Sequence, residues 1–294
     1  MGNRKGIIYE TNERLNAKTQ FKVSRFEEKK ARREAGEHFW SFSSGLIHSH
    51  GTRNAYQQYV MQFVQWARSN HQIRRLDVLD RCADELATEY LAERLTQGHS
   101  PYTVQAERAA LRLFFDDREL AEQLVIPARK REQITRSRKE TVREKEFQPA
   151  NWQPLIQFLL ATGLRRAEVT LLKVEDIQRD PVTGDLEVIV KKGHGKGGRP
   201  RRVPVLPGHE QNVLCLRNGR EPQELVFPHI PSHLDIHAIR RKYAQSYYQH
   251  LSGRGLPPLT GRLKRSDYDE AAVLQVSKAL GHNRKDVILR HYLR

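Results

Sequence analysis

Apolar side chains recur every three or four residues between residues 46 and 126, and this spacing predicts a helical block. Thr52 is expected to cap its first helix and Gly98 to end its second. Ser100 is expected to cap the third, because Pro101 directly after it fits the first helical turn. The large side chains on the apolar faces are expected to form a core rather than base-stacking platforms, since such residues are usually buried. They are Tyr56, Tyr59, Val60, Phe63, Ala67, Leu86, Tyr90, Leu91, Leu95, Val104, Leu111, Phe114 and Phe115.

A second patterned block begins near Phe147, and its period changes along the way. Residues 152–163 and 165–172 have helical spacing, and helical spacing returns towards the end of the chain. Between them, short apolar runs separated by turn residues predict a three-strand antiparallel meander with a long basic hairpin tip at 191–201. The expected fold class is therefore mainly α with a small antiparallel sheet, that is, α+β. The strands are expected at 174–177, 186–190 and 202–206.

The two blocks are flanked and joined by polar segments. Residues 1–45 are mixed in charge, which predicts an exposed helix or a partly disordered arm. Residues 127–145 hold eight Lys or Arg against three Glu and almost no apolar side chain, so they are expected to be a linker. This linker is either a cationic strap around a duplex or a plain solvated connection. The expected domains are a basic and polar extension (1–45), a helical domain (46–126), a basic linker (127–145) and a second domain (146–294).

Charge is the strongest feature of the composition. The 294 residues carry a formal net charge of +16, with an isoelectric point near 10.0. Such an excess favours a polyanion as partner, because each phosphate contact releases counterions; a surface charge that serves only solubility is the alternative. The chain has no run of 18 apolar residues and no secretory signal, so we expect no membrane association. Cys82 and Cys215 are too few for a disulfide framework, which favours the reducing cytoplasm.

Four segments of the second block carry clusters of candidate catalytic side chains. The stretch HGKGGRPRRVPV at 194–205 is basic and rich in glycine, but it lacks the spacing of a nucleotide-binding P-loop. The other three are ATGLRRAEVTLLKVEDI at 161–177, DIHAIRRKYAQ at 235–245 and KALGHNRKDVILRHY at 278–292. Together the four segments resemble the motifs of the tyrosine recombinase (phage integrase) family. That family has an ATGLR-x-x-E box, a lysine hairpin ending in V-P-L, an H-x-x-R box, and L-G-H followed by a tyrosine.

The resemblance implies a site-specific recombinase or integrase of a phage or mobile element, with residues 46–126 as a SAM-like core-binding domain and 146–294 as the catalytic domain. By motif position, it implies that Tyr292 is the nucleophile and that Arg165, Arg240, Lys196, His237 and His282 are catalytic, with Glu168 as a supporting acid. It also implies double-stranded DNA with a specific site as substrate, a tetramer on two duplexes, and a Holliday junction. An accessory DNA-bending or directionality factor and a nucleoid-associated cytoplasmic location are further expectations.

The chemistry of these residue types fits strand cleavage. An ordinary phenol titrates near pH 10, so a tyrosine nucleophile needs help at neutral pH. Arg165 and Arg240 can hold both non-bridging phosphate oxygens, a role that metal ions have in many nucleases. Lys196 is expected to give a proton to the departing 5′-oxygen, with His237 as base and His282 as a phosphate donor. No metal, ATP or other cofactor is expected, because the sequence lacks the corresponding motifs.

Further cations are expected to contact the DNA backbone without a chemical role. Of these, Lys191 and Lys192 are weaker alternatives to Lys196 as the proton donor. The candidate DNA contacts are Lys191, Lys192, Arg199, Arg201, Arg202, Arg241, Arg129, Lys130 and Arg131.

The chain departs from the family pattern in three places. His237 and His282 are 45 residues apart, which is longer than is typical, and the added loop at 252–270 is basic and rich in turn residues. Tyr292 follows His282 by ten residues, slightly more than is common, and only Leu293 and Arg294 follow it. Three alternatives stay open from the sequence: a type IB topoisomerase, a hairpin telomere resolvase, and a DNA-binding relative that does not cleave.

Overall fold

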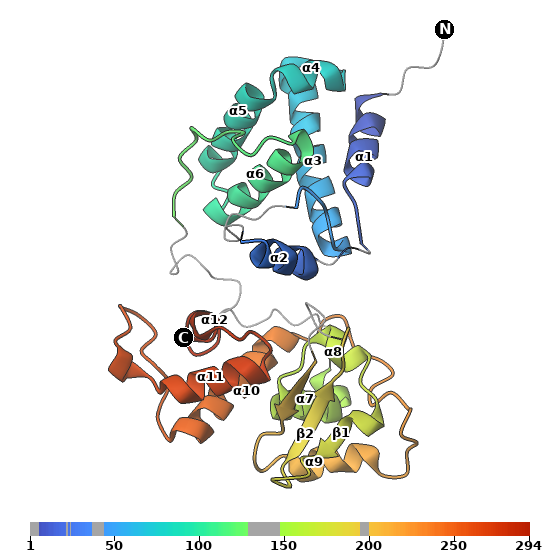
Figure 1. Ribbon diagram of the computed structural model, residues 1–294, viewed down its shortest axis with the longest axis vertical. Coiled ribbons are helices and arrows are strands. Elements are labelled where there is room, and N and C mark those ends of the chain that lie inside the picture. Colours follow the sequence, from blue (N-terminus) through green and yellow to red (C-terminus); the bar gives the residue numbers. More distant parts are fainter. Residues whose placement is uncertain (1–5, 22, 24, 37–43, 129–147, 195–199) are drawn as a thin grey trace. The chain divides into compact units, whose positions relative to one another are not determined.

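The computed structural model describes residues 6–21, 23, 25–36, 44–128, 148–194 and 200–294. The chain divides into two compact units, Met1–Ile134 and Thr135–Arg294 (Figure 1). Each unit has its own cluster of buried hydrophobic side chains, so each is described by itself. The mainly helical composition with one small antiparallel sheet confirms the expected fold class.

The described residues of the first unit form helices joined by loops, with one isolated β-bridge between Thr19 and Ile47. Its core lies between α3, α5 and α6, and includes the side chains of Phe63, Leu91 and Phe114, all fully buried. The aromatic residues that were predicted to form a core are therefore packing residues, as expected: they are buried in this cluster or partly buried against it. The cap of α6 at Ser100 is also confirmed, whereas α3 begins earlier than predicted, because Ser49 rather than Thr52 accepts the capping hydrogen bond. The helices are α1 (Ile7–Ala17), α2 (Arg25–Glu34), α3 (His50–His71), α4 (Leu76–Arg81), α5 (Ala83–Thr96) and α6 (Pro101–Phe115).

The amino-terminal segment is part of this unit, in contrast to the expected separate extension. Ile7, Thr11 and Leu15 recur every four residues on α1, and all three are buried. The chain after α1 is tied to Ile47 by backbone hydrogen bonds, from Ile47 N to Lys18 O at 2.8 Å and from Gln20 N to Ile47 O at 2.9 Å. Residues from α1 thus share one core with the helical block, and the boundary expected at residue 45 is not a boundary between packing units.

The second unit combines a meander with helices. Its strands are β1 (Ile177–Arg179), β2 (Leu186–Val190) and β3 (Arg201–Pro204), antiparallel in the order β1-β2-β3. The first strand was predicted three residues too early, because Val174–Asp176 forms a turn of 3₁₀ helix capped by the Asp176 carboxylate on Lys173 N. The α-helices are α7 (Gln153–Thr162), α8 (Arg166–Thr170), α9 (Glu210–Leu214), α10 (Ile236–Ser252), α11 (Glu270–Ala279) and α12 (Lys285–His291). Further 3₁₀ turns are Pro149–Trp152, Cys215–Arg217 and Arg265–Asp267.

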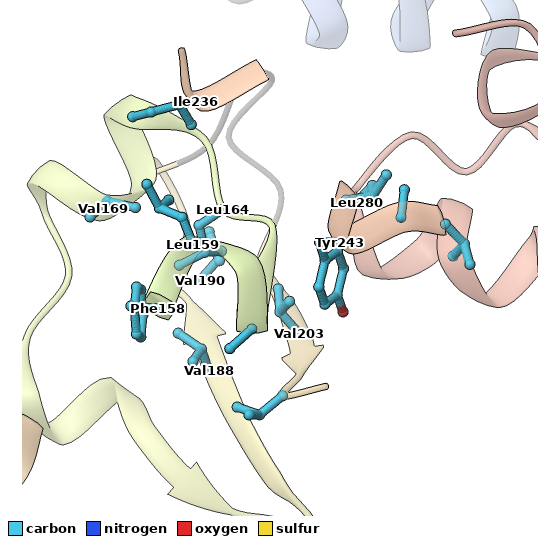
Figure 2. Close-up of a cluster of buried hydrophobic side chains, with 14 of the residues drawn as sticks. Phe158, Leu159, Leu164, Val169, Val188, Val190, Val203, Ile236, Tyr243 and Leu280 are labelled. Atoms are coloured by element: carbon cyan, nitrogen blue, oxygen red, sulfur yellow. The ribbon is translucent and has the colours of Figure 1, made fainter. Parts of the chain in front are cut away.

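The sheet and α7 enclose a core that also receives α10 (Figure 2). Val188 pairs with Val203 across the strands, so both side chains leave the same face of the sheet, towards Phe158 of α7. Gly163 ends α7 with φ +57°, and a Cβ there would overlap the ring of Tyr243 from α10. The absence of a side chain at Gly163 thus lets α10 approach the start of α8, where Arg165 and Arg166 lie.

Candidate active site

Arg165 lies directly before α8 and is held by the first turn of that helix. Its backbone N–H donates to Glu168 Oε2 at 2.8 Å, and its guanidinium donates from NH1 to Glu168 Oε1 at 2.9 Å. The second guanidinium nitrogen, NH2, donates to the carbonyl of Leu280 at 3.0 Å. The sequence spacing R-x-x-E therefore produces a side chain that is fixed at both ends of its fork.

Arg240 lies one helical turn after His237 on α10, and 1% of its surface is exposed. Its NH1 donates to the carbonyl of Gly163, and its NH2 donates to the carbonyl of Leu280 at 2.5 Å. Leu280 O thus accepts from both arginines and holds the two guanidiniums together. His237, in contrast, is exposed at the start of the helix.

Tyr292 follows α12, and its phenol points into the group formed by the two arginines. Its oxygen lies 3.3 Å from Nε of Arg240 and 3.1 Å from Nε2 of His282. His282 Nε2 is also 3.4 Å from NH2 of Arg165. Arg240 and His282 therefore flank the hydroxyl group, and Arg165, from a third distant segment, contacts the same imidazole.

The position of Tyr292 is set by its neighbours in the chain and by α10. Leu293 is fully buried in the core, and the ring of Tyr292 is 8% exposed. The α10 side chains of Gln245 and Arg241 donate to the carbonyls of Tyr292 and His291, at 3.2 Å and 3.0 Å. These contacts fix the backbone on which the phenol is carried.

Two cavities open beside these side chains. One, of about 320 Å³, is lined by Arg165, Arg166, His237 and Arg240 with the residues around the start of α10. The other, of about 430 Å³, is lined by His237, His282 and Tyr292 together with Arg241 and neighbouring residues. A phosphate group in the first cavity would lie against both arginines.

The comparisons with known proteins agree on this architecture. Residues 42–118 match the family model of the phage integrase N-terminal SAM-like domain. The fold is similar to the XerH site-specific recombinase bound to palindromic difH substrate in a post-cleavage complex, with TM-score 0.52, 17% identity and coverage of 98% of this chain and 90% of that chain. It is also similar to part of the Tn1549 transposon integrase bound to circular-intermediate DNA, with TM-score 0.50, 14% identity and coverage of 91% and 94%. The chain has a tyrosine-recombinase fold.

The resemblance expected from the sequence is thereby confirmed at the level of the fold and of the SAM-like domain. A search of curated proteins gave no match. Within the described residues, no helix is long and apolar enough to cross a membrane. Nor does any group of three His, Cys, Asp or Glu side chains gather there as metal ligands would.

Burial and positive charge set the protonation states within this tyrosine-recombinase fold. Burial, followed by the charges of Arg165 and Arg240, lowers the pKa of His282 to about 4, so the imidazole is neutral at physiological pH. His237 has an exposed surface, but the protein atoms around its ring desolvate it in part, and this, followed by the charge of Arg240, lowers its pKa. Burial lowers the pKa of Arg240 to about 10, which still leaves it charged. The site therefore presents two cations and neutral histidines.

The hydrogen-bond geometry fixes which nitrogen of His282 carries the proton. An arginine can only donate, so the contact from Arg165 requires a lone pair on His282 Nε2. The same lone pair can accept the phenol proton of Tyr292, while Arg240 Nε donates to the phenol oxygen. His282, predicted as a phosphate donor, thus lies where a proton acceptor for the tyrosine would be. No hydrogen bond joins His237, the predicted base, to Tyr292 in the described structure.

The predicted DNA contacts lie in different surroundings. Lys192 is exposed, and Arg202 is largely exposed and pairs with Asp180 and Glu187. Lys191 pairs with Glu175 at 2.5 Å and Asp176 at 2.8 Å. Arg201 does not fit the prediction of a backbone contact, because its guanidinium is turned inward onto Glu168. Arg241, half-buried, donates to a backbone carbonyl, while Lys196, Arg199, Arg129, Lys130 and Arg131 lie outside the described residues.

The sequence interpretation gave Arg201 only a DNA contact and gave Arg166 no role. The guanidinium of Arg166 donates to the carbonyls of Pro231, Ser232 and Leu234 just before α10. Both are adjacent in the chain to a residue that was assigned a role. Their neighbours in space come from distant segments, so no motif spacing indicates them.

Proposed function

We propose that this protein is a site-specific DNA recombinase, an integrase that cuts and rejoins DNA through a covalent link between Tyr292 and a 3′-phosphate. The observation that carries the proposal is the placement of the Tyr292 hydroxyl between Arg240 and His282, with Arg165 in contact with the same imidazole nitrogen, Nε2. A tyrosine held by two cations and a neutral base is what an attack on a phosphodiester requires.

The cleavage step conserves the energy of the phosphodiester. The phenol oxygen of Tyr292 forms a bond to phosphorus, its proton passes to a base, and the bond from phosphorus to the 5′-oxygen breaks. The 5′-oxygen leaves as a hydroxyl after it receives a proton, for which Lys196 is the candidate from the sequence. A 5′-hydroxyl from a second strand then reverses the step, so that strand exchange needs no external energy source.

The two arginines stabilise the charge of the transition state. Both line the same cavity, and both are restrained by the carbonyl of Leu280, so their forks are organised before DNA arrives. Arg165 and Arg240 are proposed to hold the non-bridging oxygens of the scissile phosphate. Pre-organised donors of this kind typically contribute on the order of 10²- to 10³-fold to the rate.

His282 is proposed as the proton acceptor for Tyr292, in place of His237. The lone pair on its Nε2 lies 3.1 Å from the phenol oxygen, closer than the 3.4 Å to NH2 of Arg165, and its lowered pKa keeps the imidazole neutral. His237 lines both cavities, which supports a contact with the phosphate or with the DNA strand instead.

The substrate is proposed to be double-stranded DNA with a specific recombination site, bound by a tetramer on two duplexes through a Holliday junction. The net charge of +16 supports a polyanion partner, and the similar XerH and Tn1549 structures contain DNA. An accessory DNA-bending or directionality factor and a location at the nucleoid belong to the same proposal.

The test is capture of the covalent intermediate on natural DNA. Wild type and Tyr292→Phe are each incubated with sheared genomic DNA of the source and then denatured. The DNA that remains attached to the protein is recovered, and its ends are sequenced. Adducts that cluster at one site in the wild type and are absent from the variant support a site-specific recombinase. Adducts scattered over the DNA would instead indicate a topoisomerase-like activity. If neither sample gives adducts while DNA binding is intact, a protein that binds DNA without cleaving it is favoured.

A further inference from the structure

Arg201, the first residue of β3, makes a two-pronged contact with Glu168 inside the second unit. Its NH1 donates to Glu168 Oε1 at 2.8 Å, and its NH2 donates to Glu168 Oε2 at 2.7 Å. Only 10% of the Arg201 side chain and 1% of the Glu168 side chain are exposed. The same carboxylate holds the backbone and guanidinium of Arg165, so Glu168 is shared between the two arginines.

The third donor of Arg201 reaches the segment that carries His282. Its Nε donates to the carbonyl of Ala279 at 2.9 Å. A Cβ built on Gly281 would lie 3.2 Å from Cδ and Nε of Arg201, so the glycine lets the guanidinium pass closely over the chain. Leu280, between these two residues, carries the carbonyl that holds both catalytic arginines.

The sheet register explains why Arg201 is turned inward. Arg201 pairs with Val190, and Val203 pairs with Val188, so Arg201 continues the row of core-facing side chains on β3. Arg202 pairs with Ile189 and leaves the opposite face, where its side chain is 56% exposed. Two identical neighbours in the sequence therefore have opposite environments.

We propose that Arg201 is a positioning residue of the cleavage reaction: it fixes Glu168, and through it the fork of Arg165, while it anchors the segment 279–282 beside them. This inference rests on the proposed function. It assigns to Arg201 no direct contact with the substrate, because its guanidinium is turned onto Glu168 and Ala279 and lines neither of the two cavities beside Arg165 and Tyr292.

The ionisation of Glu168 supplies a readout specific to this role. Burial alone would raise the pKa of Glu168, but the hydrogen bonds and charge of Arg201, and then the contacts with Arg165, lower it to about 2. Arg240 is a further charged group that interacts with Glu168. Without Arg201, burial is opposed mainly by Arg165, so the pKa of Glu168 rises and protonation at mildly acidic pH releases Arg165.

The experiment compares Arg201→Gln and Arg201→Lys with a matched control, Arg179→Gln. Arg179 is an exposed arginine of β1 whose NH1 donates to the carbonyl of Gly184. Single-turnover cleavage of the site DNA is measured from pH 5 to 8.5. Arg201→Gln is expected to be slower by on the order of 10²-fold at pH 8, with an added loss of about tenfold per pH unit once Glu168 is protonated. Arg201→Lys keeps the charge, so it should lose rate without that acid limb.

The double variant Arg201→Gln/Glu168→Gln removes both charges, and its cleavage rate is compared with the rates of the two single variants, Arg201→Gln and Glu168→Gln. It should cleave about as slowly as the slower single variant, because both changes act through one contact. Losses that multiply instead, or an Arg201→Gln pH profile parallel to that of the control, would overturn the proposal.

DNA affinity as a function of salt distinguishes positioning from a backbone contact. The slope of log K against log salt should be the same for Arg201→Gln and for wild type, whereas loss of one phosphate contact lowers it by about 0.9. A lowered slope would return Arg201 to the set of DNA contacts. If wild type itself forms no adduct, the proposed function fails, while a loss confined to the Arg201 variants bears on this inference alone.

Discussion

Replacement of Glu168 by glutamine is expected to destabilise the second unit by about 3 kcal/mol at neutral pH. The carboxylate is buried between Arg165 and Arg201, and its pKa is lowered from 4.5 to about 2. Each pKa unit corresponds to about 1.4 kcal/mol of preference for the ionised form in the folded state, which gives the estimate of about 3 kcal/mol. Glutamine has nearly the same shape, so the substitution removes the charge and leaves two cations facing an amide.

The pH dependence of this loss is the sharper part of the prediction. A carboxyl group whose folded pKa is lowered contributes its stability above the unfolded pKa of 4.5 and loses it as the pH falls towards 2. The difference in unfolding free energy between wild type and Glu168→Gln should therefore be constant above pH 5 and shrink steadily below it.

Urea denaturation between pH 2 and 7 measures this difference. The fluorescence of Trp152 reports on the second unit, with the other two tryptophans, Trp40 and Trp66, replaced by Phe in both proteins. A difference below about 1 kcal/mol at pH 7, or one that does not change with pH, would refute the account of the ion pair.

Three further variants test separate parts of the site. His282→Gln should lower the single-turnover cleavage rate by on the order of 10²- to 10⁴-fold and more than His237→Gln does; in wild type, an acid limb near pH 6.5 rather than near 4 would contradict the assignment of His282 as acceptor. Arg165→Lys should slow cleavage by on the order of 10²- to 10³-fold with DNA affinity nearly unchanged, because a point charge cannot replace a fork; equal losses in both measurements would count against it. Gly163→Ala should destabilise the second unit by at least about 3 kcal/mol in urea denaturation, since φ is +57° and the added Cβ overlaps Tyr243; a change under 1 kcal/mol would show that α10 can shift without cost.

The elements that the sequence predicted well are those with local signals. Ser100 and Pro101 define the start of α6 by cap chemistry alone, and turn residues, here Asp180–Gly184, separate β1 from β2 as expected. The predicted start of the first strand was wrong because Val174 and Ile177, three residues apart, fit a 3₁₀ turn as well as a strand. A helix was one of the two expectations for residues 1–45, but the burial of α1 in the core was not predicted, because its buried stripe has only two apolar residues, Ile7 and Leu15, in a charged segment.

The candidate site was predictable where motif position decides the role. Arg165, Arg240, His282 and Tyr292 meet in the structure as the motifs indicate. The inward turn of Arg201 was not predictable, because only the pairing with Val190 determines which of two adjacent arginines faces the core. The choice between His237 and His282 as acceptor likewise depends on distances that sequence spacing does not contain.

The central claim, that Tyr292 becomes joined to a 3′-phosphate, is tested most directly on the protein itself. Wild type that has reacted with its site DNA is treated with nuclease and trypsin, and the peptides are analysed by mass spectrometry. The account predicts a nucleotide linked through its 3′-phosphate to the peptide His291–Arg294, together with DNA ends that carry a free 5′-hydroxyl. A nucleotide on any other residue, or a link through a 5′-phosphate, would contradict it.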